Sequence, residues 1–121
     1  MSSSVGISLS SSSLPEQLRI IIDTADIVYI SIASLWEIAI KLNLGKLSLQ
    51  RSYETIVPAI DASDILMLPI SFADTVQIRN LPLHHGDPFD QMLIAQAINH
   101  SLIIISRDKK FDAYSVQRIW E

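Results

Sequence analysis

The chain has 121 residues, 49% of them hydrophobic, with a formal net charge of −4. This is the usual length of one globular domain, with enough apolar surface for a core. The acidic charge argues against a protein that holds nucleic acid by broad electrostatic attraction, because phosphate neutralisation needs clustered lysine and arginine. The absence of cysteine excludes disulfides, thiolate metal sites and cysteine nucleophiles.

The start of the chain is rich in serine. Residues 1–13 have a composition that packs poorly, so we expect a disordered N-terminus followed by one domain over residues 14–121. The first residues, MSSSVGISLSSSSLPEQ, lack the basic and apolar regions of a signal peptide, and no apolar run is long enough to span a bilayer. We therefore expect a cytoplasmic protein that has no contact with a membrane.

The first predicted element is a helix over LPEQLRIIID, residues 14–23, with Pro15 in its first turn. The run IVYISIAS, residues 27–34, is short, β-branched and apolar, which is typical of a strand covered on both faces. A helix follows in SLWEIAIKLNLGKL. There Ser34 and Glu37 have the spacing of a capping box, and Gly45 provides the stop.

The second half of the chain alternates in the same way. The pattern predicts a helix to about residue 62, a strand over 65–70 and a helix over about 71–80. After the turn LPLHHGDP it predicts a helix over 88–99, a strand over 102–106 and a last short segment, YSVQRIW. Strands that alternate with helices indicate an α/β fold with a mainly parallel sheet.

Three acids are expected at one edge of this sheet, because right-handed βαβ units gather helix N-termini and strand C-termini there. Glu37 is predicted in the first turn of the helix after residues 27–34, Asp90 in the first turn of the helix over 88–99, and Asp108 just beyond the last strand. Carboxylates that close repel one another, and a bound Mg²⁺ or Mn²⁺ is an economical compensation. Such an ion can orient phosphate oxygens and activate a water for attack on a phosphodiester.

Each acid also has a purely structural interpretation. Glu37 could be only the partner of Ser34, Asp90 a dipole-favoured residue near a helix start, and Asp108 the first residue of the turn RDKKF. Asp87 could be only the N-cap that precedes Pro88. Taken singly, the structural interpretation is favoured for each. Convergence on one edge shifts the balance toward function for Glu37, Asp90 and Asp108, whereas Asp87 stays mainly a cap.

Other polar and aromatic side chains leave two interpretations open. His84 and His85, in the loop beside the acids, could hold phosphate or a water, or could pack as turn residues. His100, at a helix end, is expected to meet the negative helix dipole. Contact with an RNA backbone and simple solvation are both open for Lys41, Arg107, Lys109 and Lys110. The aromatic residues expected in the core or an interface are Trp36, Phe89, Phe111 and Trp120.

Three segments, SIASLWEIAIKLNLGKLSL, LPLHHGDPFDQMLIAQAI and LIIISRDKKFDAYSVQRIW, together resemble the PIN domain of VapC-type toxins from bacterial toxin-antitoxin systems. The resemblance runs from about Leu14 to the C-terminus. It implies an αβα sandwich, a metal-dependent endoribonuclease with an RNA substrate and Mg²⁺ or Mn²⁺, a homodimer, and a cognate antitoxin whose tail enters the acidic crevice. The family's catalytic and metal-binding acids fall on Glu37, Asp90 and Asp108, and Gln91 stands where many relatives carry arginine.

The front of the chain departs from this family. Relatives open with a strand that ends in an aspartate, of the form LLDTHVLLW, which supplies a metal ligand and the middle strand of the sheet. Here SVGISLSSSS contains no acid and lies too near the helix at Leu14 to be that strand and its following helix, and Asp23 comes after the helix. We therefore expect the first strand to be missing and nuclease activity to be weak or absent.

Two other functions compete with the nuclease. One is a catalytically inactive PIN remnant that acts only through dimerisation or antitoxin binding. The other is a phosphoacceptor domain, which also gathers carboxylates at a sheet edge. No strand-ending aspartate followed by a lysine-bearing strand is apparent in the sequence, which leaves the phosphoacceptor function without support.

Overall fold

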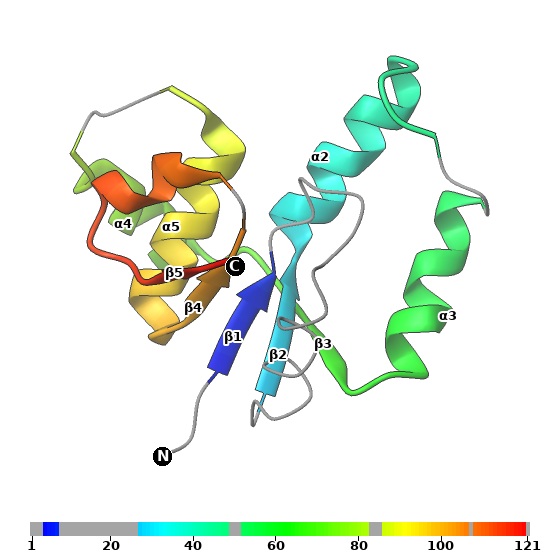
Figure 1. The fold of residues 1–121 in the computed structure, drawn as a ribbon, viewed down its shortest axis with the longest axis horizontal. Coiled ribbons are helices and arrows are strands. Elements are labelled where there is room, and N and C mark those ends of the chain that lie inside the picture. Colours follow the sequence, from blue (N-terminus) through cyan, green and yellow to red (C-terminus); the bar gives the residue numbers. More distant parts are fainter. Residues whose placement is uncertain (1–3, 8–26, 49–51, 83–85, 107, 121) are drawn as a thin grey trace.

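The computed structural model describes residues 4–7, 27–48, 52–82, 86–106 and 108–120. Within these residues, five strands form one sheet in the order β3-β2-β1-β4-β5 (Figure 1). Every neighbouring pair is parallel. The predicted α/β fold with a mainly parallel sheet is therefore confirmed. The strands are β1 (Ser4–Ile7), β2 (Ile27–Ser31), β3 (Ile65–Leu68), β4 (Ile103–Ile105) and β5 (Arg118–Ile119).

The middle position of the sheet belongs to β1. Val5 is in register with Val28 of β2 on one side and with Ile103 of β4 on the other. The prediction that the first strand is missing is wrong, and so is the predicted disorder where it covers residues 4–7. A four-residue strand has little pattern of its own, and its pairing on both edges comes from neighbours distant in sequence. The acid is nevertheless absent, since residues 1–15 contain no aspartate or glutamate. The helix predicted over 14–23 lies outside the described residues.

The first described helix, α2 (Ile32–Asn43), begins earlier than predicted. Its N-cap is Ser31, the last residue of β2, whose Oγ accepts a hydrogen bond of 3.0 Å from the backbone N–H of Ala33. The predicted capping box of Ser34 and Glu37 is wrong: Ser34 is buried inside the helix, and Glu37 lies in the second turn instead of the first. Apolar residues around the boundary suit a buried strand and a buried helix equally, so periodicity could not place it.

The end of α2 follows the prediction. Gly45 adopts a left-handed φ of 73° just after the helix. Its N–H donates to the carbonyl of Leu42 at 3.2 Å, and the N–H of Lys46 donates to the carbonyl of Lys41 at 2.9 Å. These two bonds form a Schellman motif, which satisfies carbonyls that the helix leaves open.

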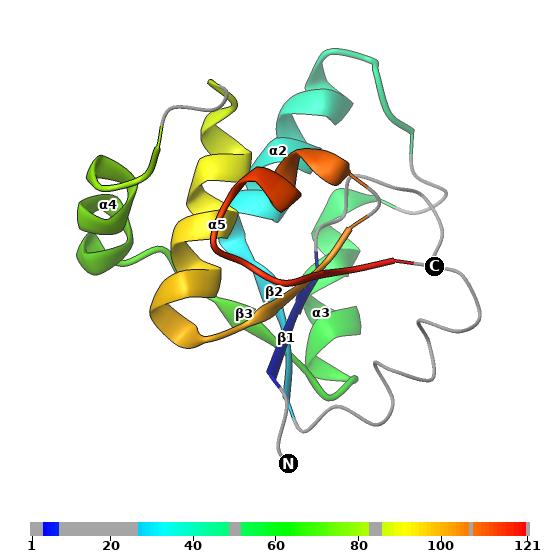
Figure 2. The ribbon, with the colours of Figure 1, turned by 60° about the vertical axis from the view of Figure 1, so that its left-hand side comes forward.

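The remaining helices cover both faces of the sheet. Figures 1 and 2 show α4 and α5 on one side of the strands and α3 on the other, as the predicted αβα sandwich requires. The helix predicted to end near residue 62 is short and follows a 3₁₀ turn, and the last segment contains a second 3₁₀ turn before β5. Their bounds are η1 (Tyr53–Thr55), α3 (Ile56–Asp61), α4 (Phe72–Arg79), α5 (Pro88–His100) and η2 (Lys109–Ala113).

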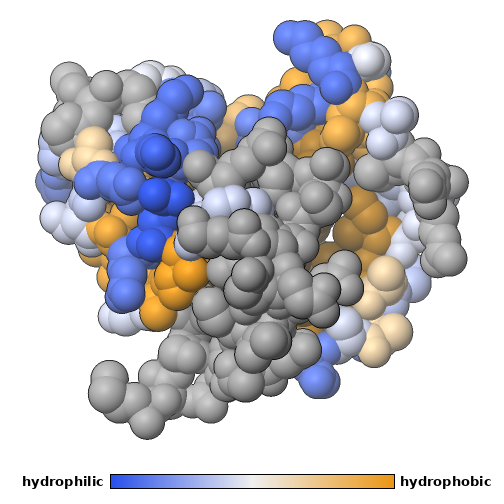
Figure 3. Space-filling model, viewed as in Figure 1, coloured by the Kyte–Doolittle hydropathy of each residue, from blue (hydrophilic) through white to orange (hydrophobic). Residues whose placement is uncertain are grey.

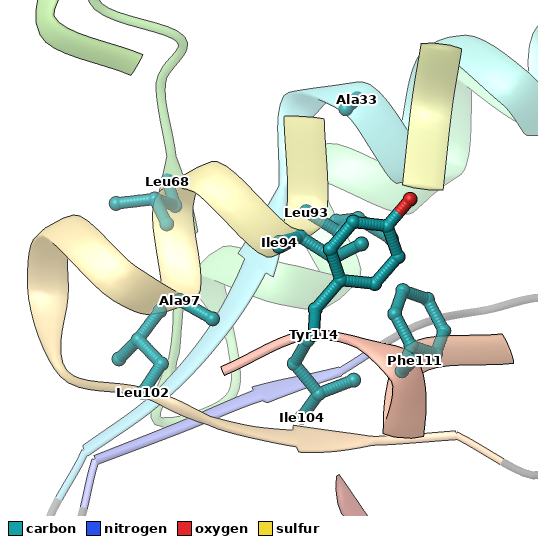
Figure 4. Close-up of a cluster of buried hydrophobic side chains, with 9 residues drawn as sticks. All are labelled: Ala33, Leu68, Leu93, Ile94, Ala97, Leu102, Ile104, Phe111 and Tyr114. Carbon is teal, nitrogen blue, oxygen red and sulfur yellow. The ribbon is translucent and has the colours of Figure 1, made fainter. Parts of the chain in front are cut away.

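Among the described residues, buried apolar side chains form a cluster on each face of the sheet. In the larger one, Leu93 and Ile94 of α5 pack with Ile104 of β4 and with Phe111 of η2 (Figure 4). The other cluster joins Ile30 of β2 to side chains of α2 and α3. Phe111 is 1% exposed, which confirms its predicted place in the core. None of the described helices has the length and apolarity needed to cross a membrane.

Candidate active site

Asp87 and Asp90 lie at the start of α5. The Oδ1 atom of Asp87 accepts hydrogen bonds from the backbone N–H groups of Phe89, at 2.9 Å, and Asp90, at 3.1 Å. Asp87 is therefore the N-cap, as predicted, and Pro88 occupies the first turn, where a missing N–H costs nothing. Asp90, one helical turn further on, is only 9% exposed. A carboxylate so buried at a helix start needs a reason beyond helix formation.

The environment of Asp90 is unfavourable for a negative charge. Burial raises the pKa of Asp90 to about 7, from an ordinary value of 3.8. The positive charge of Lys110 acts in the opposite direction but does not cancel the increase. Part of the increase comes from three neighbouring carboxylates, those of Asp87, Asp108 and Glu37. The charges of Glu37 and Asp108 therefore act on Asp90, as expected from the order of the strands and helices.

Glu37 reaches this group from α2. Its side chain is 21% exposed and forms an ion pair of 3.4 Å with Lys41, one turn further along the helix. A pair of this spacing on a helix surface stabilises by only about 0.3–0.5 kcal/mol. The pair places the positive charge of Lys41 beside Glu37. The predicted contact of Lys41 with RNA remains a proposal.

Asp108 follows β4 and caps the short helix η2. Its carboxylate accepts from the N–H of Lys110 at 3.0 Å, and its own N–H donates to Oγ of the buried Ser106 at 3.1 Å. The segment is also held from β5, because the guanidinium of Arg118 donates to the carbonyl of Ser106 at 3.1 Å and to both carboxylate oxygens of Asp112. These bonds keep Asp108 at the carboxyl end of β4.

The other predicted site residues have different outcomes in the structure. In the described part of the chain, no group of three or more His, Asp and Glu side chains is placed so that it could hold one metal ion. His84, His85 and Arg107 lie outside the described residues. His100 is the last residue of α5, where it was expected. Trp36, expected in the core or an interface, is 56% exposed, so in this chain alone it is not a core residue.

Two features that join α5 to α2 were not predicted: the hydrogen bonds of Gln96 and a contact between two aromatic rings. The hydroxyl of Ser31 donates to Oε1 of Gln96 at 2.5 Å, and Nε2 of Gln96 donates to the carbonyl of Pro69 at 3.1 Å. Further along the same two helices, the rings of Trp36 and Phe89 meet edge to face, with centroids 5.0 Å apart. The available signal for the first feature was a single amide inside the apolar run LIAQA, since a buried amide needs a hydrogen-bond partner.

Comparison with known proteins identifies the family of the chain. The PIN domain family model matches residues 4–117. No curated protein matches the sequence. Since the family model matches almost the whole chain, it can be assigned from the sequence itself, and the solved structures then test the fold independently.

The fold is similar to FitAcB from Neisseria gonorrhoeae, with 19% identity, coverage of 95% of this chain and 96% of that chain, and a TM-score of 0.60. It is also similar to VapBC2 from Rickettsia felis bound to a DNA fragment from their promoter, with 15% identity, coverage of 87% and 83%, and a TM-score of 0.63. For FitAB bound to an IR36 DNA fragment the values are 22%, 96%, 93% and 0.58. These likenesses show a shared fold, and together with the match over residues 4–117 they lead to one conclusion: this chain belongs to the PIN domain family.

Proposed function

We propose that this PIN domain is the toxin of a VapC-type toxin-antitoxin system, a metal-dependent endoribonuclease of the cytoplasm. The observation that carries the proposal is the state of Asp90: a nearly buried carboxylate on which three further carboxylates act, in a protein with a net charge of −4. Repelling acids are retained at an active site when a cation or a proton-transfer step makes use of them. The resemblance to VapC-type toxins supports the same choice.

The donor set suits a hard cation. Mg²⁺ and Mn²⁺ prefer carboxylate oxygens, and Mg²⁺ is commonly bound by one or two carboxylates, while waters and substrate phosphates complete the shell. Such a shell does not need three protein ligands at one point, which agrees with the absence of a three-ligand group in the described residues. We assign Asp90 as the main ligand, and Glu37 and Asp108 as the further metal-binding and catalytic acids, which reach the ion directly or through its bound waters. When bound, the ion supplies charge neutralisation for the phosphodiester and an activated water.

The chain's own side chains then have separate tasks. Asp90 must lose its proton to serve as a ligand, and Glu37 and Asp108 keep a negative field at the site. Lys109 and Lys110, exposed on η2 beside Asp108, can contact phosphate oxygens of the RNA, as can Lys41. Hydrophilic side chains gather over η2 and β5 on one side of the molecule (Figure 3). The acidic chain would thus meet its polyanionic substrate through a cation and a few lysines.

The alternative is a catalytically inactive PIN domain that acts through its partners alone. One observation favours it: β1 lies in the middle of the sheet, but residues 1–15 carry no acid that could complete the metal site. Fewer carboxylates bind a hard cation more weakly. We therefore expect a site that binds the ion weakly and cleaves slowly, and the inactive domain is the limiting case of this expectation.

The proposed partners are a second copy of the chain and a cognate antitoxin. Three apolar side chains, Ile32, Trp36 and Ile40, stand exposed at four-residue spacing on α2, the helix that carries Glu37. An apolar row of this kind is typical of a protein contact. Light scattering should give twice the chain mass for the homodimer. The change Ile40→Glu should lower this mass if the row forms the contact between copies, and a monomeric parent chain would contradict the homodimer.

The nuclease is tested by incubation of a mixed RNA substrate with the chain in Mn²⁺, in Mg²⁺ and in EDTA. We expect slow cleavage that requires the metal and that Asp90→Asn abolishes. The control is Asp61→Asn, which removes an exposed carboxylate at the end of α3 and should cleave like the parent chain. Equal cleavage by the parent and by Asp90→Asn would refute the site. No metal-stimulated cleavage by the parent would favour the inactive domain.

A further inference from the structure

The buried side chain of Gln96 joins the two helices that carry Glu37 and Asp90. Gln96 is 1% exposed, and its Oε1 accepts a hydrogen bond from the hydroxyl of Ser31, which is 4% exposed. Ser31 is at once the last residue of β2 and the N-cap of α2. Through its Nε2 atom, Gln96 also donates to the carbonyl of Pro69, directly after β3. One amide of α5 thus holds the carboxyl ends of two neighbouring strands and the start of α2.

The position of this bond matters because the two helices run in opposite directions. α2 leaves the carboxyl end of β2, whereas α5 returns toward the amino end of β4 (Figure 1). Glu37 lies six residues after Ser31, and Asp90 lies six residues before Gln96. Six helical residues rise about 9 Å. Because the helices are antiparallel, Glu37 and Asp90 both lie on the same side of the bond between Ser31 and Gln96. This one bond therefore places the two acids at the same height along the pair of helices.

A second contact closes the same pair of helices near the acids. Trp36 precedes Glu37 and Phe89 precedes Asp90, and their rings meet edge to face at a centroid distance of 5.0 Å. An edge-to-face pair contributes about 0.5–1.5 kcal/mol beyond its buried area. Trp36 is 56% exposed, however, so this contact is open to solvent, whereas the bond between Ser31 and Gln96 is shielded. The buried bond is therefore the stronger constraint on the relative height of α2 and α5.

We propose that Gln96, through Ser31, is a positioning residue that holds Glu37 against Asp90 for joint binding of the divalent cation. The expected effect on metal binding rests on the proposed function, whereas the hydrogen bonds that join the two helices are independent of it. Groups that orient metal ligands without touching the metal typically change metal affinity by 10–100-fold when they are removed. The effect should therefore appear in cation binding, beyond any effect on stability.

The affinity test uses Mn²⁺ alone as the probe, titrated into the full chain by calorimetry. Gln96→Met keeps the length of the side chain and removes its amide, and we expect a Kd at least tenfold weaker. Ser31→Ala removes the hydroxyl and should weaken binding similarly, and it carries the test if Gln96→Met does not fold. Ser31→Thr keeps the hydroxyl and, unlike Ser31→Ala, should bind Mn²⁺ with the affinity of the parent chain. The control is Asp74→Ala, which breaks a bond from α4 to Asn99 of α5 and leaves α2 untouched.

Asp74→Ala is expected to lower stability but to keep the Kd within twofold of the parent. If Asp74→Ala weakens Mn²⁺ binding as much as Gln96→Met does, affinity follows overall stability and the positioning role is overturned. An unchanged Kd in both Gln96→Met and Ser31→Ala overturns it as well. The change at Asp74 also removes a partly buried side-chain hydrogen bond of α5, so it reproduces a loss of stability while the bond between Ser31 and Gln96 stays in place.

A second measurement separates this inference from the proposed function, because it needs no metal. The chain has no cysteine, so cysteines placed at the exposed Asn43 of α2 and His100 of α5 can carry the only spin labels. Pulsed electron resonance should give a narrow distance distribution in the parent. We expect it to broaden or shift in Gln96→Met and Ser31→Ala but not in Asp74→Ala.

The combined outcomes are distinct. A parent chain that fails to bind Mn²⁺, yet shows the distance change in Gln96→Met, refutes the metal site and leaves the bridge between the helices intact. An unchanged distance distribution in Gln96→Met and Ser31→Ala refutes the bridge, whether or not the parent binds Mn²⁺. A changed distance with an unchanged Kd refutes the positioning role.

Discussion

The carboxylate of Asp87 binds the backbone N–H of Asp90 at 3.1 Å and, from this position, helps to raise the pKa of the Asp90 side chain. Asp87, the N-cap of α5, therefore also places a negative charge beside Asp90. Here the same carboxylate satisfies two N–H groups of α5 and contributes to the field at Asp90.

The metal-free protein should lose stability as the pH rises toward 7. The pKa of Asp90 is raised in the folded state, so the folded protein holds this proton more tightly than the unfolded chain does. The resulting stability is complete below the ordinary pKa of 3.8 and is lost as the pH rises to about 7. At ~1.4 kcal/mol for each pKa unit, the loss is on the order of 4 kcal/mol. Urea unfolding between pH 4 and pH 8 measures it.

Asp90→Asn supplies the control for this pH dependence, since an amide has no proton to lose. The variant should show a flatter profile and should be more stable than the parent at pH 8 without metal. If the parent and the variant have parallel profiles, Asp90 does not titrate as described, and its burial beside the other acids does not raise its pKa.

Asp74 should stabilise the protein as a charged, fully buried group. Burial raises the pKa of Asp74, but the backbone N–H of Ser71 and the amide of Asn99 donate to its carboxylate and leave the pKa below 3.8. Asp74→Ala should cost about 2 kcal/mol at pH 7, because hydrogen bonds to charged groups are the stronger ones.

The sign of the pH effect at Asp74 is opposite to that at Asp90. A lowered pKa means that stability is present above 3.8 and is lost as the pH falls through the folded-state pKa. The difference between the parent and Asp74→Ala in urea unfolding should therefore shrink at pH 3. Asp61→Ala, at an exposed position, should stay within about 0.5 kcal/mol of the parent. A loss at Asp61 as large as that at Asp74 would contradict this account.

Phe111 should be among the most costly side chains to remove. It is 1% exposed and packs with Tyr114 and with the apolar face of α5 (Figure 4). Phe111→Ala should destabilise by about 3–5 kcal/mol, the sum of lost burial and of the cavity left behind. The matched control is Phe72→Ala, because Phe72 is 82% exposed on α4. Thermal unfolding compares the two, and similar losses for both would contradict the assignment of Phe111 to the core.

The start of α5 was predictable from the sequence because its signals are local. Asp87 followed by Pro88 is typical of an N-cap and first turn, and the structure has both in those roles. Gly45 ended α2 for an equally local reason, its left-handed φ. Where one residue's own chemistry sets a boundary, the sequence is sufficient.

The features that the sequence did not reveal depend on distant partners. Ser31 and Ser34 are equally good caps in the sequence, and only the end of β2 at Ser31 decides between them. β1 has four residues and becomes a strand because β2 and β4 pair with it. Gln96 meets Ser31 across 65 residues, a separation at which periodicity carries no information. That Glu37 and Asp108 lie near enough to act on Asp90 was predictable, because the order of strands and helices alone brings these three residues together.

We propose that Glu37, Asp90 and Asp108 act together on one divalent cation, and Mn²⁺ titration of single variants tests this most directly. We predict weak but measurable binding by the parent chain, at least tenfold weaker binding by Glu37→Gln, Asp90→Asn and Asp108→Asn, and parent-like binding by Asp61→Asn. Equal affinity in the parent and in the three site variants would contradict the account.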